Sequence, residues 1–204
     1  MNIYPFSLGE LQANCYLLQE GNEALLIDPG DDASFLLEEI QRRNLTLVGI
    51  MATHGHFDHV MAVGEIQLGI PTPFYIHKKD QFLIDRLGST AEHFLGHKPI
   101  VIPPQQTTFL PSDIVQISNF KFKIIHTPGH TPGSVCYSVE SEKLLFTGDT
   151  LFMGAVGRTD LSYSSREDLV HSLHLLAGYP EETTIYPGHG EQTILADEKN
   201  VTLF

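Results

Sequence analysis

The segment Thr53–Val60 reads THGHFDHV and places three histidines and one aspartate within six positions. Imidazole nitrogens and carboxylate oxygens both bind divalent transition metals. The alternatives to a metal site are a solvated loop, a pH sensor, and chance in a histidine-rich chain. Chance rarely produces this pattern, and a pH sensor needs only scattered histidines, with no aspartate at a fixed offset. The remaining choice lies between a solvated loop and a metal site.

The rest of the chain favours the metal site, because the same local design recurs. Four apolar segments, LTLVGIMAT, KFKIIHTPG, KLLFTG and TTIYPG, each run into a glycine-bearing loop that carries a possible ligand. In open α/β sheets, such loops converge at the carboxyl ends of the strands, and glycine lets the backbone turn sharply there. We therefore expect one site that brings together His54, His56, Asp58, His59, His130, Asp149 and His189.

Seven potential ligands exceed the need of one metal ion. A tetrahedral zinc ion takes about four ligands, so the sequence predicts two divalent ions. Zinc is the expected metal, and iron and manganese also suit imidazole and carboxylate ligands. His54 and His56 alternate and can face one ion together with His130, whereas Asp58 and His59 can face a second together with His189. Asp149 can bridge the two ions, because a carboxylate has two oxygens.

Other titratable residues carry different expectations. His126 ends a strand and is expected to be a hydrogen-bonded structural residue, and His171 and His174 are expected on a solvated helix face. Asp28 ends the apolar run LLIDPG. It either holds the second nitrogen of a ligand histidine or forms a turn.

The elements that must position these residues are short apolar strands alternating with helices, which is typical of an α/β layered fold. Helices are predicted over Asp31–Arg43, from near His59 to Gly69, and over Ser164–Gly178, which opens with the capping-box pattern Ser164-x-x-Glu167. The predicted strands are Cys15–Gln19, Ala24–Ile27, Thr46–Ala52, Phe74–His77, Val115–Ile117, Lys121–His126, Ser134–Val139, Lys143–Thr147 and Thr184–Tyr186.

A loop is predicted over Gly88–Lys98. His77, His93 and His97 lie in or near it, and lining a substrate site is one role open to them.

Length and composition indicate one globular domain over residues 1–204, with 42% hydrophobic and 18% charged residues. No apolar run approaches the ~18 residues of a membrane helix, and the N-terminus shows no secretory signal. A cytoplasmic location and no membrane partner are therefore expected. Cys15 and Cys136 are expected to be buried free thiols.

The net charge is −13, with 12 Lys and Arg against 25 Asp and Glu. Nucleic acids are usually bound by a basic face, so no nucleic-acid partner is expected. A small anionic substrate remains compatible with this charge if metal ions supply positive charge locally.

The segments THGHFDH, HTPGHTPGS, FTGDTLF and PGHG, in this order, resemble the metallo-β-lactamase superfamily, and more closely its hydroxyacylglutathione hydrolase (glyoxalase II-like) branch. The resemblance covers nearly the whole chain. It implies a four-layer αβ/βα sandwich with two mixed sheets face to face, helices outside and a dinuclear metal site at one edge. It also implies the ligand sets, with His54, His56, His130 and Asp149 for the first metal and Asp58, His59, Asp149 and His189 for the second.

The sequence departs from the full-length glutathione-specific enzymes in two places. Only 15 residues follow His189, so the helical C-terminal extension of those enzymes is expected to be absent. After FTGDTLF those enzymes carry a Gly-Lys/Arg-x-Tyr-like segment, whereas this chain reads GAVGRTDLS. Arg158 can match the basic residue and bind a substrate carboxylate, but the tyrosine is missing. The short form of the glyoxalase II-like branch fits better, and the thiol carrier stays open.

The expected reaction is hydrolysis of a hydroxyacyl thioester, such as a lactoyl-glutathione-like small molecule, by a hydroxide that bridges the metals. Asp58 is expected to orient this hydroxide. The leaving thiolate has an intrinsic pKa near 8.5 and needs no strong general acid. The oligomeric state stays open.

Three other functions remain under consideration. A persulfide dioxygenase of the same superfamily shares the motifs and a segment like Gly157–Asp160, but uses a single iron and dioxygen. A lactonase, β-lactamase or phosphodiesterase could use the same dinuclear centre. A non-catalytic scaffold would have little reason to keep all seven ligands.

Overall fold

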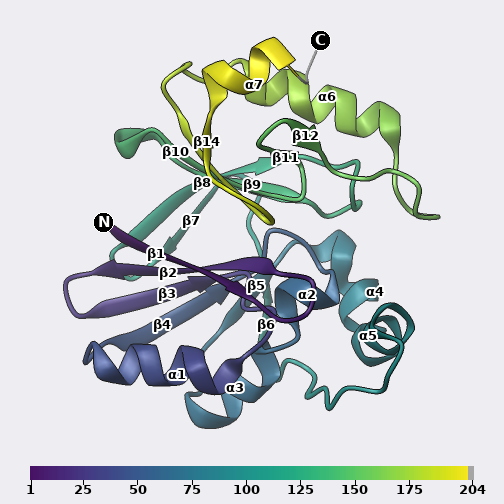
Figure 1. Cartoon of the computed structure of the whole chain (residues 1–204). Coiled ribbons are helices and arrows are strands. Elements are labelled where there is room, and N and C mark those ends of the chain that lie inside the picture. Colours follow the sequence, from purple (N-terminus) through teal and green to yellow (C-terminus); the bar gives the residue numbers. More distant parts are fainter. Residues whose placement is uncertain (202–204) are drawn as a thin grey trace.

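The computed structural model describes residues 1–201 (Figure 1). The last three residues of the domain predicted over 1–204 lie outside this range. Two six-stranded sheets lie face to face, each with parallel and antiparallel strands, and helices cover their outer faces (Figure 1). This is the α/β four-layer sandwich that the resemblance implied, so the predicted fold class is confirmed.

The first sheet has the strand order β1-β2-β3-β4-β5-β6, and α1 and α3 cover its outer face (Figure 1). Side chains alternate between the two faces, as strand geometry requires. Leu26 packs with the outer helices, whereas its neighbour Leu25 packs between the sheets. The elements of this half are β1 Asn2–Leu8, β2 Ala13–Glu20, β3 Glu23–Ile27, α1 Ala33–Arg42, β4 Thr46–Met51, α2 Phe57–Val60, α3 Val63–Gly69, β5 Phe74–Ile76, α4 Gln81–Ile84, α5 Leu87–Leu95 and β6 Thr107–Phe109, with a 3-10 turn, η1, at Lys78–Asp80.

The second sheet has the order β14-β13-β10-β9-β8-β7, and α6 and α7 cover its outer face (Figure 1). Its inner face contributes Tyr137 and Phe146, both fully buried, to the core between the sheets. Its elements are β7 Ile114–Ile117, β8 Phe120–His126, β9 Val135–Val139, β10 Leu144–Gly148, α6 Arg166–Ala177, β13 Thr184–Pro187, β14 Thr193–Ile194 and α7 Leu195–Val201, with a 3-10 turn, η2, at Glu140–Glu142 and a small hairpin of β11 Leu151–Phe152 and β12 Ala155–Val156.

The predicted helix starts need correction. Helix α6 is capped by Ser165, whose hydroxyl accepts the backbone N–H of Asp168 at 3.1 Å. Ser164, which the capping-box pattern nominated, instead donates its hydroxyl to the backbone oxygen of His130 at 2.8 Å. The helix predicted from near His59 to Gly69 is divided into α2 and α3.

The loop predicted over Gly88–Lys98 is wrong, because most of this segment forms helix α5. Leu87 and Ala91 are spaced one helical turn apart and are buried. Gly96 ends the helix in the left-handed conformation, with φ of 73°, which costs glycine little. The helical spacing of these apolar residues accounts for the helix.

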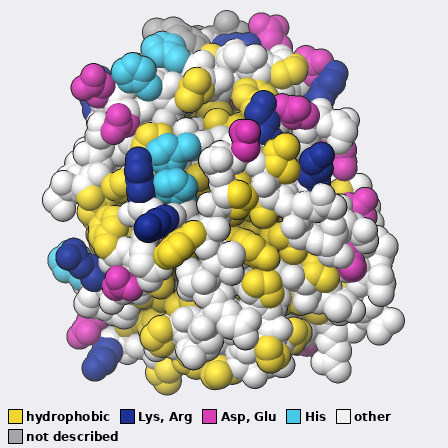
Figure 2. Space-filling model, turned by 180° about the vertical axis from the view of Figure 1, so that it is seen from behind, with side chains coloured by type: hydrophobic (Ala, Val, Ile, Leu, Met, Phe, Trp, Pro, Cys, Tyr) yellow, Lys and Arg dark blue, Asp and Glu magenta, His cyan; other side chains and the backbone are white. Residues whose placement is uncertain are grey.

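The surface shown in Figure 2 carries basic side chains interspersed with acidic ones among the described residues. Within residues 1–201, no helix is long and apolar enough to cross a membrane. Cys15 and Cys136 are buried free thiols, as predicted.

Candidate metal centre

The four glycine-bearing loops converge, and they bring all seven predicted ligands together. The loops follow β4, β8, β10 and β13, so both sheets contribute to the site. The side chains form two groups whose nitrogen and oxygen atoms could each hold a metal ion: His54, His56, His130 and Asp149 in one group, and Asp58, His59 and His189 in the other.

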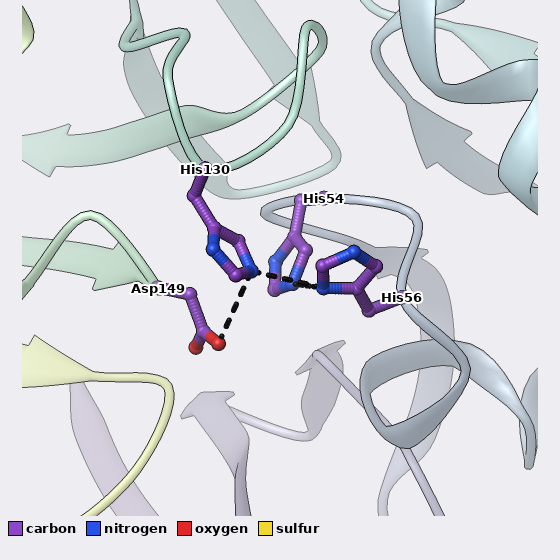
Figure 3. Close-up of side chains that lie close together, drawn as sticks. All are labelled: His54, His56, His130 and Asp149. Atoms are coloured by element: carbon purple, nitrogen blue, oxygen red, sulfur yellow. Dashed lines mark hydrogen bonds and ion pairs between the residues drawn. The ribbon is translucent and has the colours of Figure 1, made fainter. Parts of the chain in front are cut away.

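The first group is shown in Figure 3. Nδ1 of His56 lies 3.1 Å from Nε2 of His54 and 2.9 Å from Nε2 of His130. Nε2 of His130 lies 3.4 Å from Oδ2 of Asp149. Three imidazoles and one carboxylate thus point at one small volume, and His54 and His130 are almost completely buried there.

The second group lies beside the first. Nε2 of His59 is 3.3 Å from Nε2 of His189 and 3.7 Å from Oδ2 of Asp58. Oδ2 of Asp58 lies 3.3 Å from Nε2 of His189. His59 is fully buried, whereas the His189 side chain is 30% exposed, so this group opens to the solvent.

Asp149 lies between the two groups. Its Oδ2 faces His130, and its Oδ1 lies 3.4 Å from Nε2 of His59. Oδ1 is buried and has no hydrogen-bond partner among the described residues, which is costly for a carboxylate unless a cation is bound. A Cβ added to Gly188 would lie 2.2 Å from this oxygen. The donor set, the unpaired oxygen and the close glycine fit a bound metal ion.

Hydrogen bonds on the outer side of the site fix the orientation of the imidazole rings. Nδ1 of His59 lies 3.2 Å from Oδ2 of Asp28. The same carboxylate accepts the Thr53 hydroxyl at 2.7 Å, and that hydroxyl lies 3.1 Å from Nδ1 of His54. Both nitrogens can therefore donate outward and leave Nε2 free to bind a metal. Of the two roles considered for Asp28, the structure shows the contact with the second nitrogen of His59.

His130 and His56 are held by residues from the loop before α6. Nδ1 of His130 donates to the backbone oxygen of Arg158 at 3.0 Å. Nε2 of His56 lies 2.8 Å from the hydroxyl of Tyr163. Sequence reasoning did not identify Tyr163, because 107 positions separate it from His56 and it belongs to no ligand motif.

The pKa values of histidines in the two groups are shifted in opposite directions. Burial and the positive charge of His130 lower the pKa of His56 to about 3, and burial with neighbouring imidazoles also lowers the pKa of His54. Burial alone would lower the pKa of His59, but the carboxylates of Asp149 and Asp58 outweigh it and raise the pKa to about 10. The imidazoles of His54 and His56 are therefore neutral near pH 7 and able to bind a cation, whereas His59 must first release a proton.

A cavity of about 250 Å³ opens above the two groups. Arg158 lies at this cavity, where its guanidinium forms a two-pronged ion pair with Asp160 at 2.7 and 2.8 Å. Apolar side chains form one part of its lining, and residues of the two groups form another. The lining residues are Leu11, His56, Phe57, Asp58, Thr90, Phe94, His130, Asp149, Arg158, Leu161 and His189.

The remaining histidines lie elsewhere. Among the described residues, His77, His93 and His97 do not line this cavity. His97 pairs with Glu10 at 2.9 Å. His126 is a structural residue, as predicted, because its Nε2 donates to the backbone oxygen of Pro132 at 3.0 Å.

Two curated relatives match nearly the whole chain. Hydroxyacylglutathione hydrolase GloC of Haemophilus influenzae is 33% identical over 207 residues, covering 100% of this chain and 98% of the relative. The probable metallo-hydrolase YqgX of Bacillus subtilis is 32% identical over 198 residues, covering 97% of this chain and 94% of the relative.

Solved structures with the same fold include three informative ones. TTHA1623 in a di-iron-bound form has 37% identity and a TM-score of 0.90, with 98% of each chain covered. The BLEG-1 B3 metallo-beta-lactamase has 35% identity and a TM-score of 0.89, covering 98% of this chain and 97% of the other. ETHE1 from Myxococcus xanthus has 27% identity and a TM-score of 0.77, covering 98% of this chain and 82% of the other.

The family model of the metallo-beta-lactamase superfamily matches residues 8–189. This range contains all seven residues of the two metal-binding groups. Together with the four-layer fold and the histidine–aspartate cluster, the match shows that this chain belongs to the metallo-beta-lactamase superfamily.

Proposed function

We propose that the chain is a dinuclear metallo-hydrolase that cleaves a hydroxyacyl thioester resembling lactoyl-glutathione. The observation that carries this proposal is the place of Asp149 between the two groups in the lining of one cavity, where its carboxylate lies 3.4 Å from Nε2 of His130 and 3.4 Å from Nε2 of His59. A carboxylate in this position can bridge two cations, and two cations suit hydrolysis.

The proposed ligands follow the two groups, with Asp149 shared. Zinc is the proposed metal, and iron or manganese would suit the same donors. The di-iron-bound form of TTHA1623 supports two-metal occupancy, but leaves the metal of this chain to experiment. The proposed ligand sets are His54, His56, His130 and Asp149 for one ion and Asp58, His59, Asp149 and His189 for the other.

When bound, the two metal ions would lower the pKa of a water molecule toward neutrality and polarise the substrate carbonyl. The role of Asp58 is to orient that water. Burial alone would raise the pKa of Asp58, but the neighbouring His59 and His189 outweigh it and lower this pKa. Asp58 therefore stays a carboxylate, which accepts hydrogen bonds and can fix the direction of a water O–H.

The cavity walls have complementary roles in substrate binding. Arg158 is proposed to bind a substrate carboxylate, since its guanidinium already holds the carboxylate of Asp160 in a two-pronged contact at the cavity edge. Phe57 and Phe94, whose rings stack with centroids 6.0 Å apart, form part of the apolar wall. We propose that this wall contacts the thiol side of the substrate and limits access of bulk water.

The experiment is a turnover panel with the metal-loaded protein. We expect S-lactoylglutathione and other hydroxyacyl thioesters to be hydrolysed with kcat/KM at least a hundredfold above that for a lactone, a β-lactam and a phosphodiester. The 33% identity to GloC supports this ranking. A β-lactam or lactone as the best substrate would contradict the thioester assignment.

A mononuclear iron oxygenase acting on a persulfide is the second candidate. Two of the three histidines of the first group, together with Asp149, could supply the two-histidine, one-carboxylate set that is typical of non-haem iron(II) oxygenases. The segment Gly157–Asp160 supports the same candidate. One iron per chain, with dioxygen uptake on addition of a glutathione persulfide and no thioester cleavage, would favour this candidate over the hydrolase.

A further inference from the structure

Asp80 is a buried carboxylate next to the metal centre but outside both groups of ligands. Its exposed fraction is 0%. Oδ1 accepts the backbone N–H of Gly133 at 2.6 Å, and Oδ2 accepts the backbone N–H of Gly55 at 2.9 Å and the hydroxyl of Thr131 at 2.7 Å. Burying a charge costs free energy unless the charge is paired or fully hydrogen-bonded. The three hydrogen bonds offset this cost, and each joins Asp80 to a neighbouring loop.

All three donors belong to the loops that carry the histidines of the first group. Gly55 lies between His54 and His56, and Thr131 directly follows His130. One carboxylate therefore joins the loop after β4, in the first sheet, to the loop after β8, in the second. The relative position of the three imidazoles in Figure 3 depends on these two loops.

The packing around Asp80 leaves little room for the loops to shift. A Cβ added to Gly133 would lie 2.5 Å from Oδ1 of Asp80, and one added to Gly55 would lie 3.0 Å from the Asp80 backbone oxygen. Both glycines thus let the backbone approach Asp80 closely. The two loops are therefore packed closely against Asp80.

The segment that carries Asp80 is itself anchored to the second sheet. The ring of His77 stacks on that of His126, with centroids 4.5 Å apart and planes at 22°. Nε2 of His126 donates to the backbone oxygen of Pro132, and the next residue, Gly133, donates to Asp80. These contacts close a ring that fixes Asp80 against the His130 loop.

We infer that Asp80 is a positioning residue that holds the loops of His54, His56 and His130 in the arrangement required to bind a metal ion. The inference rests on the ligand set proposed above. An outer hydrogen-bond partner of this kind typically changes metal affinity by about 10- to 100-fold. Asparagine cannot replace Asp80, because its amide NH2 would face one of the three donors.

The test compares Asp80→Asn with the wild type by titrating the metal-free proteins with cobalt(II). We expect the dissociation constant for the first group to rise about 10- to 100-fold. The visible absorption bands of the bound cobalt should also change, since they report ligand geometry. Equal affinities and identical spectra would overturn the inference.

Glu198→Gln is the matched control. Glu198 is also a buried carboxylate, 2% exposed, and it accepts the backbone N–H of Gly154 and the hydroxyl of Thr193, both at 2.7 Å. The Glu198→Gln substitution should lower the melting temperature of the protein and leave its affinity for cobalt and the cobalt absorption spectrum unchanged. If this control weakens cobalt binding as much as Asp80→Asn does, the effect is a general loss of stability and the positioning role is wrong.

Thr131→Val replaces Asp80→Asn in this test if the Asp80→Asn protein does not fold. It removes one of the three hydrogen bonds to Asp80 and should weaken cobalt binding in the same direction by a smaller factor. An unchanged affinity in a folded Thr131→Val protein would then overturn the inference. A wild type that binds no cobalt would refute the ligand set and the positioning role together, whereas normal wild-type binding with an unaffected variant refutes only the role of Asp80.

Discussion

Four of the site histidines make a hydrogen bond through the ring nitrogen that faces away from the metal-binding groups. The outer partners differ in chemistry: the Thr53 hydroxyl, the Tyr163 hydroxyl, the Asp28 carboxylate and the Arg158 backbone oxygen. The contacts with Thr53, whose hydroxyl already donates to Asp28, with Asp28 itself and with the Arg158 oxygen favour the tautomer whose inner nitrogen carries a lone pair. These hydrogen bonds therefore determine which ring nitrogen of each histidine is turned toward the place of a metal ion.

Asp149→Asn tests the proposed bridge between the groups. The amide has a single oxygen and no negative charge, so it cannot serve two cations. We expect the number of bound metal ions to fall from two to one, and kcat/KM for the thioester to fall by more than the roughly 100-fold typical for loss of an outer partner. Elemental analysis and a turnover assay measure both, and Asp85→Asn, at an exposed position, should change neither.

Arg158→Ala tests the proposed substrate contact. The side chain is 54% exposed, so its ion pair with a substrate is screened by water, and we expect KM for S-lactoylglutathione to rise by about fivefold with little change in kcat. The neutral thioester S-lactoyl-N-acetylcysteamine should keep its KM. Asp160→Asn frees the guanidinium and should lower KM for the anionic substrate; a rise of KM in that variant would contradict the role.

At the element scale, the strands that lead to the site could be predicted from their apolar runs. All nine predicted strands overlap observed ones. Strand β1 was missed because Asn2–Leu8 is exposed or half-buried except at Leu8 and contains Pro5, yet it pairs with β2 along its full length. Its formation depends on a neighbour that the local sequence does not reveal.

Some site residues can be recognised from neighbouring sequence, whereas others depend on contacts with residues far away in the chain. The glycine loops and their ligands can be recognised because strand, turn and ligand are adjacent in sequence. Asp80 and Tyr163 cannot, because their partners lie tens of residues away and only folding brings them together. The roles of Arg158 and of the individual ligands stay predictions.

Gly188→Ala tests the close approach of the loop after β13 to the two groups of predicted ligands. The new Cβ would lie 2.2 Å from Oδ1 of Asp149 and 2.8 Å from Cε1 of His59, so both side chains must move. A displacement of about 1 Å can cost about a hundredfold in rate, and we expect a loss of this size in kcat/KM. Gly88→Ala is the control, because its Cβ would meet nothing closer than 4.0 Å; equal losses in the two variants would contradict the explanation.

The stack of His77 on His126, between the end of β5 and β8, predicts a pH-dependent stability. Burial, with the positive charges of His126 and Lys79, lowers the pKa of His77 to about 4, from 6.5. The folded protein therefore binds fewer protons than the unfolded chain between these values, and this contribution to stability is present above pH 6.5 and lost as the pH falls through 4.

Denaturant unfolding at pH 7, 5.5 and 4 measures this contribution when the wild type is compared with His77→Gln. We expect the wild type to lose more unfolding free energy than the variant as the pH falls. A difference between the two proteins that is the same at every pH would exclude His77 as the source.

At the scale of the whole molecule, the two sheets meet along a common core, and each supplies loops to the site. His54 and His59 come from the first sheet, whereas His130, Asp149 and His189 come from the second. Binding of metal ions should therefore join the two halves of the fold. The net charge of −13 favours cation binding, and bound cations would give an acidic protein a local site for an anionic substrate.

The number of metal ions bound per chain tests the central claim most directly. We expect elemental analysis of the purified, zinc-loaded and gel-filtered protein to give two metal ions per chain, reduced to one in Asp149→Asn. A wild-type value of one ion or none, unchanged by excess zinc, would contradict a dinuclear centre built from these converging loops.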